Sequence, residues 1–436
     1  MSIIRINTEK IIGDFKPLNC VNNGPVHKRH AVDQSRSNIE TYKAARIPYA
    51  RNHDAAFNAG YGGEHSVDIS AIFPDFTANP YVPESYDFAC TDEYILVTLD
   101  ADTKTFFRLG QKIEHYIKKY NIYPPADFHK WAVVCEHIIR HYTKGWANGF
   151  KLDMPYWEIW NEPDLDAEDN PYKRTWAGTK AQFYDLYEVT AKHLKKCFPH
   201  LKIGGPAVAG WLEWAEDFIN EMSARNVPID FFSWHAYCTE PSRIVNASNL
   251  YRERLDKAGY TETESILNEW NYVQGWMGEE FIYSIEKICG LKGAAFIMAC
   301  MSEAQRTSID MLMYYDARPS VFNGMWDFYT LRPFKGYYPF LWYGSFYDLK
   351  EVEYTRDDDE IYVLSGVDEN GKSKTVITYY TNNDNAPEKT VSIDFGRSGE
   401  YDVFAVDENN SSELIATTTK TEFTMKVHTI LLICEK

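Results

Sequence analysis

The sequence of 436 residues contains no run of about 18 apolar residues, the length that an α-helix needs to cross a bilayer. Its first ten residues, from Met1 to Lys10, also lack the apolar stretch and the small-residue cleavage site of a secretory signal peptide. We therefore expect a cytoplasmic protein without a membrane partner.

Positive charge is scarce as well. The chain has 45 Lys and Arg against 63 Asp and Glu, a net charge of −18, and its longest basic stretch is the short segment 27–30. An acidic surface repels phosphate backbones, so nucleic acid is not an expected partner.

Paired cysteines are missing too. The eight cysteines are scattered without any C-x-x-C spacing, and most lie inside apolar segments. This pattern favours buried free thiols over a disulfide framework or a zinc knuckle.

Two weaker cofactor signals are also rejected. His137 and His141 have the i, i+4 spacing of two zinc ligands on a helix, but Ile138 stands where zinc proteases carry their glutamate base. The glycines of segment 60–63 do not lead from a strand into a helix, which argues against a nucleotide loop. We expect no metal and no organic cofactor.

Aromatic residues, by contrast, are abundant. They make up 15% of the chain, with 12 Trp and 31 Tyr, while 44% hydrophobic and 25% charged residues are typical of a large globular body. Sugar rings present apolar C–H faces that stack on aromatic planes, so a carbohydrate ligand explains the excess. An aromatic-rich core explains it equally well.

Short β-type runs alternate with stretches of helical periodicity, the pattern of a parallel sheet with crossover helices. Eight such runs match the strand number of a (β/α)8 barrel. They are Lys16–Val21, Arg46–His53, Thr105–Leu109, Tyr156–Asn161, Lys202–Gly205, Phe231–His235, Ser265–Asn268 and Met311–Tyr315.

Between these runs, apolar residues recur every three or four positions in Asp127–Tyr142, Gln182–Phe198 and Trp214–Ala224, which predicts amphipathic helices. The long gap after the second run begins with the glycine-rich segment 58–65. We expect an insertion there that forms a wall of a binding site.

After about Phe346 the helical periodicity ends and β-runs alternate with turns. We predict a barrel over residues 1–345 and an antiparallel β-sandwich-like module over residues 346–436. The predicted strands of the module include Ile361–Leu364, Lys374–Thr378, Thr390–Phe395, Tyr401–Val406 and Thr424–Ile433.

The sharpest segment is Tyr156–Asp164, an apolar run that ends in Asn161, Glu162 and a proline. Polar groups at the C-terminal end of a barrel strand point into the active-site mouth. Glu158 should lie deeper in the barrel and Glu162 at its rim, which makes Glu162 the better catalytic group. The neighbouring Trp160 would raise the pKa of Glu162 by desolvation, as a general acid requires.

A second apolar run, Ser265–Asn271, also ends in a glutamate beside a tryptophan. The two runs are the fourth and seventh strands of the predicted barrel, so Glu162 and Glu269 should face each other across its mouth. Retaining glycoside hydrolysis needs two carboxyl groups about 5 Å apart, one to protonate the leaving oxygen and one to attack the anomeric carbon.

These motifs, Trp160-Asn-Glu-Pro163 and Leu267-Asn-Glu-Trp-Asn271, resemble those of clan A glycoside hydrolases, and family 39 most closely. The resemblance runs from about residue 16 to residue 345. It implies that Glu162 is the catalytic acid/base and Glu269 the nucleophile.

Further residues match the same pattern. The resemblance implies that Arg51 braces the nucleophile, His53 lies in the sugar pocket, His235 and Tyr237 contact sugar and nucleophile, and Asn161 binds the sugar 2-hydroxyl. A buried structural ion pair for Arg51, and roles in the core for the two histidines, are the alternatives.

Trp270 and Trp326 are predicted as sugar platforms, with simple packing as the alternative. The segments Phe106–Gly110 and 60–76 depart from the xylosidase members of the family, and both lie where substrate is chosen.

We therefore predict an exo-acting retaining glycosidase that acts on an oligosaccharide or glycoside, with xylose as the favoured sugar and with galactosides and arabinosides left open. An endo-glycanase of the same clan and an inactive carbohydrate-binding protein are the rivals. The C-terminal module is expected to pack against the barrel or between subunits, so a homo-oligomer stays open.

Overall fold

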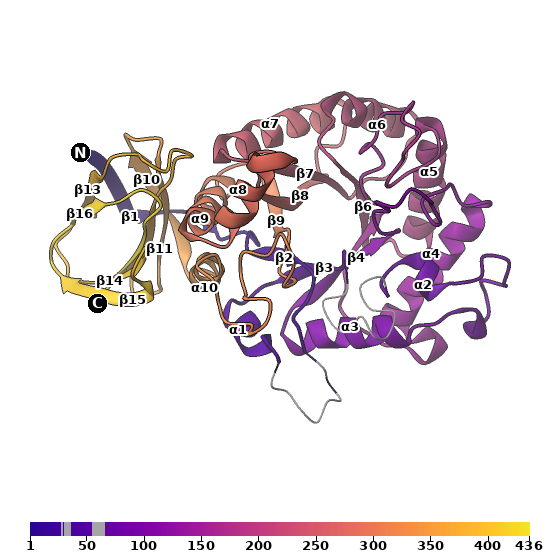
Figure 1. Cartoon of the computed structure of the whole chain (residues 1–436), viewed down its shortest axis with the longest axis horizontal. Helices are drawn as coiled ribbons and strands as arrows, with labels where there is room; N and C mark the ends of the chain where they lie inside the picture. Colours follow the sequence, from indigo (N-terminus) through magenta and orange to yellow (C-terminus); the bar gives the residue numbers. More distant parts are fainter. Residues whose placement is uncertain (28, 30–35, 55–65) are drawn as a thin grey trace.

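The computed structural model describes residues 1–27, 29, 36–54 and 66–436. Figure 1 shows two parts side by side: a large barrel ringed by helices and a smaller β-module that holds both chain ends. The glycine-rich segment 60–63 and the start of the expected insertion fall outside the described residues.

Within the described residues, eight parallel strands close into a barrel in chain order, so the predicted (β/α)8 fold is confirmed. Each lies within or overlaps one of the eight predicted runs. The strands are β2 (Cys20–Asn22), β3 (Tyr49–Arg51), β4 (Lys104–Leu109), β5 (Tyr156–Ile159), β6 (Lys202–Val208), β7 (Phe231–Cys238), β8 (Glu264–Tyr272) and β9 (Ile309–Tyr314).

Helices surround this barrel, most visibly α4 to α7 in Figure 1. The α-helices of the described chain are α1 (Ile39–Ala44), α2 (Ile69–Ile72), α3 (Ala89–Asp100), α4 (Phe128–Lys144), α5 (Lys180–Cys197), α6 (Leu212–Ala224), α7 (Pro241–Lys257), α8 (Gly278–Ile288), α9 (Leu291–Ala304) and α10 (Tyr337–Gly344). Short 3-10 turns, η3 (Pro83–Ser85) and η4 (Trp146–Asn148), lie between them.

The three helices predicted from periodicity are confirmed as α4, α5 and α6. Local capping sets the ends of the first two. Asp127 accepts the backbone N–H of Lys130 at the start of α4, and Gly145 ends it in the left-handed conformation. Thr179 and Gln182 form a capping box at the start of α5.

The inside of the barrel is layered, which positions the site. Polar side chains including Arg51, Glu158 and Ser233 form a buried hydrogen-bonded layer in the middle. An apolar plug closes the barrel below them, and it consists of Cys20, Phe106, Tyr156, Phe231, Ile266, Met311 and Met313.

The module is one curved sheet in the order β15-β14-β17-β12-β11-β10-β1-β13-β16 among the described residues. Its pairs are antiparallel except β1 with β13, which is parallel. The strands are β1 (Ser2–Asp14), β10 (Lys350–Arg356), β11 (Ile361–Val367), β12 (Ser373–Tyr379), β13 (Lys389–Asp394), β14 (Tyr401–Val406), β15 (Ser411–Thr418), β16 (Glu422–Met425) and β17 (Ile430–Glu435).

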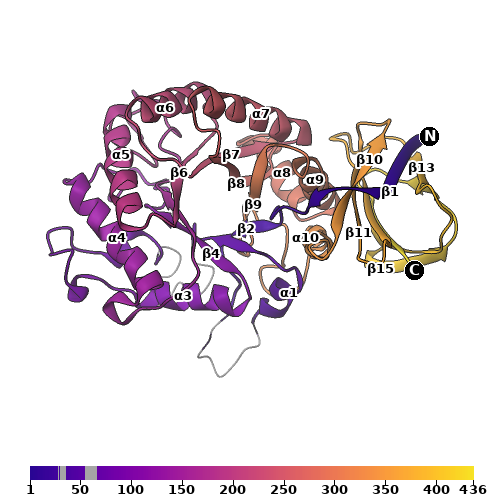
Figure 2. The same cartoon turned by 180° about the vertical axis from the view of Figure 1, so that it is seen from behind.

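Two features of this sheet differ from the expectation. β1 was placed with the barrel in the division at residue 345, yet it pairs with β10 and β13 of the module, and Figure 2 shows it running from there to β2. Its partners are distant in the sequence, so its own residues carry no signal of them. The predicted strand Thr424–Ile433 is two strands, because the left-handed His428 breaks it (φ 68°).

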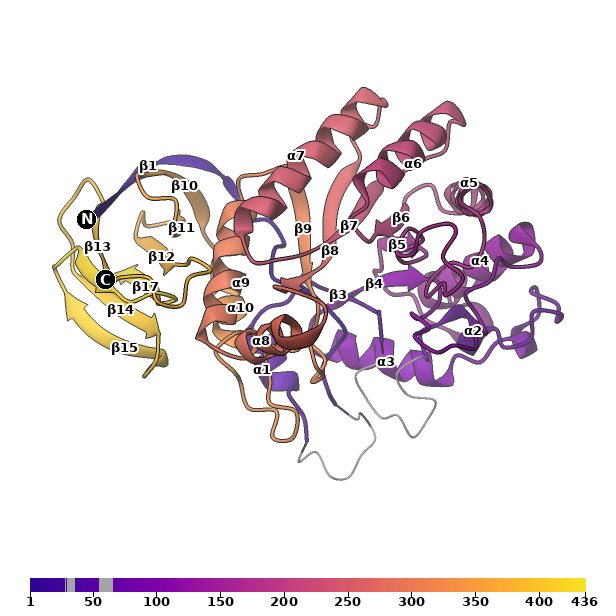
Figure 3. The same cartoon turned by 45° about the horizontal axis from the view of Figure 1, so that its top comes forward.

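The module packs against the barrel through α9 and α10, which stand between the two parts in Figure 3. Apolar residues of the module such as Leu364 and Val376 join the core of the barrel. Lys292 of α9 donates to the backbone oxygen of Asn382 (2.7 Å) and pairs with Asp384 (2.7 Å). Of the two expected arrangements, the structure shows the module packed against the barrel.

Across the described ranges, the helices are each too short or too polar to cross a membrane.

Candidate active site

The end of β5 turns two polar side chains into the barrel mouth. The strand ends at Ile159, earlier than predicted, and both Trp160 (φ 74°) and Glu162 (φ 46°) adopt the left-handed conformation that non-glycine residues rarely use. Trp160 packs outward against Trp131 of α4, which leaves Asn161 on the inside. Such local strain is common where side chains must be aimed at a ligand.

The end of β8 also turns polar side chains into the barrel mouth, but through a β-bulge. The register between β7 and β8 shifts after the pair Trp234–Leu267, so that His235 pairs with Glu269. This bulge places both Asn268 and Glu269 on the inside, where Asn268 donates to Glu158. β-Bulges commonly redirect side chains beside active sites.

The two predicted carboxylates therefore meet. One oxygen of Glu162, one of Glu269 and a ring nitrogen of His235 all lie within 4.8 Å of one another, and all three residues are buried. The strands that carry the glutamates are the fourth and seventh of the barrel, as expected.

Burial raises the pKa of Glu162 from 4.5 to about 7, against the opposing electrostatic effect of the neighbouring His53 and Arg51 side chains. The predicted direction is thus found, but its cause is burial of the whole site. Trp160 itself packs on the helix side, with its ring tilted against Trp131 and edge-on to Trp176.

Arg51 is the central cation of the site. Its Nε donates to Glu158 (2.7 Å), its Nη1 lies 3.3 Å from Glu269 Oε2, and its Nη2 donates to Asn161 Oδ1 (2.6 Å). Both the expected contact with Glu269 and the alternative, a buried ion pair, are present in one side chain. Its guanidinium offsets the charge of two buried carboxylates.

His235 and Tyr237 come from β7 and contact the two glutamates. His235 Nδ1 lies 2.8 Å from Glu162 Oε1 and 3.6 Å from Glu269 Oε2. Tyr237 donates its hydroxyl to Glu269 Oε1 (2.5 Å), and burial keeps the pKa of Tyr237 well above 10, so it remains a donor.

Three buried nitrogens of these residues lack a hydrogen-bond partner within the described part of the chain: Asn161 Nδ2, His53 Nε2 and His235 Nε2. His53 Nε2 is 3.8 Å from Glu269, and its other nitrogen is 3.0 Å from Asp54. Unpaired buried polar atoms are costly, so several converging on one spot are the mark of a ligand-binding site.

The prediction that Trp270 and Trp326 are sugar platforms is wrong, because both rings are buried. Trp270 is fully buried with its ring 5.5 Å from that of Tyr314, because the bulge that turns Glu269 inward turns Trp270 outward. Trp326 is fully buried too, stacked on Tyr42 with its Nε1 donating to Thr41. Neither ring can accept a sugar.

The exposed tryptophans at the mouth are different ones. Trp276 follows β8, is 56% exposed and contacts the ring of Tyr237 at 4.9 Å, while Trp211 follows β6 and is 60% exposed. Both occur in loops directly after barrel strands, and that position is the signal that could have identified them.

Among the residues that the structure describes, two groups of side chains have the spacing of metal ligands. In the first, Glu162, His235 and Glu269, the cation Arg51 already contacts Glu269. In the second, Glu136 pairs with His193 (2.7 Å) and Arg140 (2.6 Å) near Cys197, on the outer helices. Both groups hold a protein cation next to a carboxylate, which disfavours a metal ion.

The helical histidines considered for zinc have structural partners. His137 Nδ1 contacts the backbone oxygen of Val133, and His141 pairs with Asp92 (2.9 Å) while stacking on Phe88.

Residues 64–268 match the family Glycosyl hydrolases family 39. The chain is 36% identical over 197 residues to a β-xylosidase of Geobacillus stearothermophilus and 31% identical over 186 residues to a β-xylosidase of Caldicellulosiruptor saccharolyticus. These segments cover 43% and 40% of the chain but only 37% and 35% of the two relatives.

The whole chain also matches solved structures. A glucosidase from Croceicoccus marinus superposes with a TM-score of 0.76 at 22% identity, and a monomeric β-xylosidase from Caulobacter crescentus with 0.72 at 15% identity. Each match covers 100% of this chain and 99% of the other, which shows a common fold. The resemblance to family 39 of the glycoside hydrolases that the sequence motifs predict is therefore confirmed.

Proposed function

We propose that this protein is a retaining glycoside hydrolase with Glu162 as acid/base and Glu269 as nucleophile. The observation that carries the proposal is the approach of the two carboxylates to within 4.8 Å. Retaining enzymes hold this pair about 5 Å apart, whereas inverting enzymes leave room for a water molecule at about 6.5 to 9.5 Å.

In the first step, Glu162 donates its proton to the glycosidic oxygen as the bond from that oxygen to the anomeric carbon breaks. Glu269 attacks the same carbon and forms a glycosyl ester. With a pKa of about 7, Glu162 carries the proton that this step requires at pH values below about 7. In the second step, Glu162 takes a proton from water, whose oxygen displaces Glu269 and releases the sugar.

The neighbouring residues support the two roles. Arg51 and Tyr237 each contact a different oxygen of Glu269, which orients the carboxylate and favours its charged form. Asn161 accepts from Arg51 through Oδ1, so its amide Nδ2–H is directed elsewhere and is suited to the sugar 2-hydroxyl. That hydrogen bond strengthens in the transition state.

For the substrate we propose exo-cleavage of β-xylosides. The two curated relatives are both named β-xylosidases, which supports this choice. β-Galactosides and α-L-arabinosides are the alternative substrates, and an endo-glycanase or an inactive binding protein are the alternative functions. Both carboxylates and their partners are in place, which argues against the last.

The test is hydrolysis of a panel of 4-nitrophenyl glycosides by the wild type and by Glu162→Ala and Glu269→Ala, with and without azide. Alanine leaves room for azide in place of the lost carboxylate. We expect azide to rescue Glu162→Ala with a glycosyl azide of retained configuration and Glu269→Ala with one of inverted configuration. Glu253→Ala, which removes an exposed carboxylate on α7, is the matched control.

Two results would contradict the proposal. If the wild type cleaves no glycoside of the panel and no oligosaccharide, the protein is not a glycosidase. If one variant keeps wild-type activity, the assignment of that glutamate is wrong. Chain-length analysis of products from xylo-oligosaccharides separates exo-action, which releases single xylose units from the start, from endo-action.

A further inference from the structure

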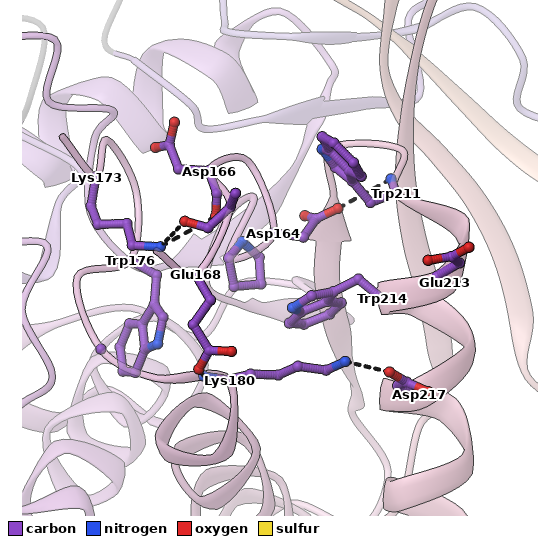
Figure 4. Close-up of a pocket in the computed structure, with 13 residues that line it drawn as sticks. Asp164, Asp166, Glu168, Lys173, Trp176, Lys180, Trp211, Glu213, Trp214 and Asp217 are labelled. Atoms are coloured by element: carbon purple, nitrogen blue, oxygen red, sulfur yellow. Dashed lines mark hydrogen bonds and ion pairs between the residues drawn. The ribbon is translucent and has the colours of Figure 1, made fainter. Parts of the chain in front are cut away.

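A hollow of about 260 Å³ lies beside the loop that follows Glu162 (Figure 4). Its wall begins with Pro163 and Asp164, directly after Glu162, and continues to α6. Three tryptophans line it, namely Trp176, Trp211 and Trp214. None of the side chains described above as contacting Glu162 or Glu269 lines this hollow.

Hydrogen bonds connect the wall of the hollow to the loop that carries Glu162. The buried carboxylate of Asp164 accepts the backbone N–H of Ala209 (2.8 Å) and of Trp211 (3.3 Å), so the loops after β5 and β6 are joined two residues beyond Glu162. Figure 4 shows Asp164 beneath the Trp211 backbone. A ligand in the hollow would therefore keep a constant position relative to Glu162.

The tryptophans differ in how they are held. Trp176 is buried against Trp160, and Trp214 stacks on Phe218 at 5.6 Å. Trp211 is 60% exposed and has no ring partner or hydrogen bond from its indole within the described residues. A large aromatic plane left open beside a catalytic group is costly to expose and is suited to stacking on a ligand.

The charged groups around the rings indicate the class of ligand. Lys180 is paired with Asp217, Lys173 donates to a backbone oxygen, and Asp166 pairs with Arg174. The carboxylate of Glu213 has no partner in the described chain. Acidic side chains outnumber the lysines in the lining, so an anionic ligand is repelled while a neutral polyhydroxylated one finds hydrogen-bond acceptors.

We propose that this hollow binds a neutral pyranose of the leaving group, with Trp211 as its stacking platform. The proposal rests on the proposed function, because Glu162 donates its proton to the leaving oxygen and the leaving group must extend on its side. An aromatic plane for the apolar C–H face and carboxylates for the hydroxyls are the two elements that a sugar ring requires.

The test compares two substrates that differ in their leaving group. The leaving group of 4-nitrophenyl β-xyloside contains no sugar, whereas that of xylotriose contains two xylose units. We expect Trp211→Ala to lower kcat/KM for xylotriose about tenfold, equivalent to about 1.4 kcal/mol, and to change that for the nitrophenyl substrate less than about twofold. Trp211→Phe should recover most of the loss. Tyr172→Ala removes an exposed ring that does not line the hollow, from the loop between β5 and α5, and should change kcat/KM for neither substrate.

An equal loss on both substrates would show that Trp211 only supports the loop, and no loss on xylotriose would remove the subsite. Calorimetry provides a readout without turnover: Trp211→Ala should weaken xylotriose binding to Glu269→Ala enzyme about tenfold. If the wild type cleaves neither substrate, the proposed function fails. The calorimetric comparison then tests the binding site by itself. An unchanged Kd for xylotriose after Trp211→Ala would reject the proposed subsite.

Discussion

His235 Nδ1 lies 2.8 Å from Oε1 of Glu162. Burial lowers the pKa of His235 to about 4 and raises that of Glu162 to about 7, so near pH 6 the imidazole is neutral and the carboxyl carries the proton. The protonated carboxyl then donates to His235 Nδ1, or to a glycosidic oxygen that replaces it. His235 thus holds the acid in place without competing for its charge.

The first prediction concerns pH. Because the first step requires protonated Glu162, kcat/KM for a xyloside with a poor leaving group, such as methyl β-xyloside or xylobiose, should fall as pH rises through about 7, by about tenfold per unit above it. A 2,4-dinitrophenyl xyloside needs no proton, so its basic limb should be absent. An identical limb for both substrates would assign it to another group.

The second prediction is a stability effect of Glu162→Gln. The pKa of Glu162 is raised on folding, so the folded state binds the proton more tightly and stability falls as pH rises from about 4.5 to 7. The lost stability is on the order of 3 kcal/mol, and the glutamine variant should not lose it.

Thermal unfolding of both proteins between pH 5 and pH 8 measures this. The Tm advantage of Glu162→Gln should grow with pH, whereas Glu213→Gln, an exposed control, should show a constant difference. A constant difference for Glu162→Gln would mean that its carboxyl is not buried in solution.

The third prediction concerns Tyr237. Tyr237→Phe deletes the hydroxyl that donates to Glu269 Oε1 and leaves the ring, which Trp276 contacts, in place. A hydrogen bond to a charged group contributes about 1.5 to 3 kcal/mol, so kcat/KM should fall roughly tenfold to a hundredfold. Circular dichroism and Tm should stay close to the wild type. Unchanged kinetics would show that this hydrogen bond does not orient Glu269.

The fourth prediction separates the two partners of Arg51. Arg51→Met leaves Glu158 and Glu269 buried without their cation and should lower the free energy of unfolding by about 3 to 5 kcal/mol. Glu158→Gln in the same chain removes one of those charges, so the double variant should be more stable than Arg51→Met alone while remaining inactive. Urea titrations of the single and double variants give the coupling. Additive effects would show that Arg51 and Glu158 do not interact.

Several features of the protein could be predicted from local sequence. The eight barrel strands, the three amphipathic helices and the two glutamates at strand ends were all visible, because strand and helix periods and capping residues act over neighbouring positions. The accessory strand β1 and the split of β16 from β17 were missed. The partners of β1 are far away in the sequence, and the break at His428 depends on a left-handed residue that the run of β-formers conceals.

What the sequence by itself determined is the order of strands and the chemical identity of the groups at their ends, including Glu162, Glu269 and Arg51. Only the tertiary structure decided which way those groups face. The left-handed Trp160 and the bulge at Glu269 each reverse the alternation that a regular strand would impose, and so send Asn161 and Glu269 inward and Trp270 outward. Which tryptophans remain exposed, Trp211 and Trp276 rather than Trp270 and Trp326, depends on packing between distant segments, because exposure is a property of neighbours in space.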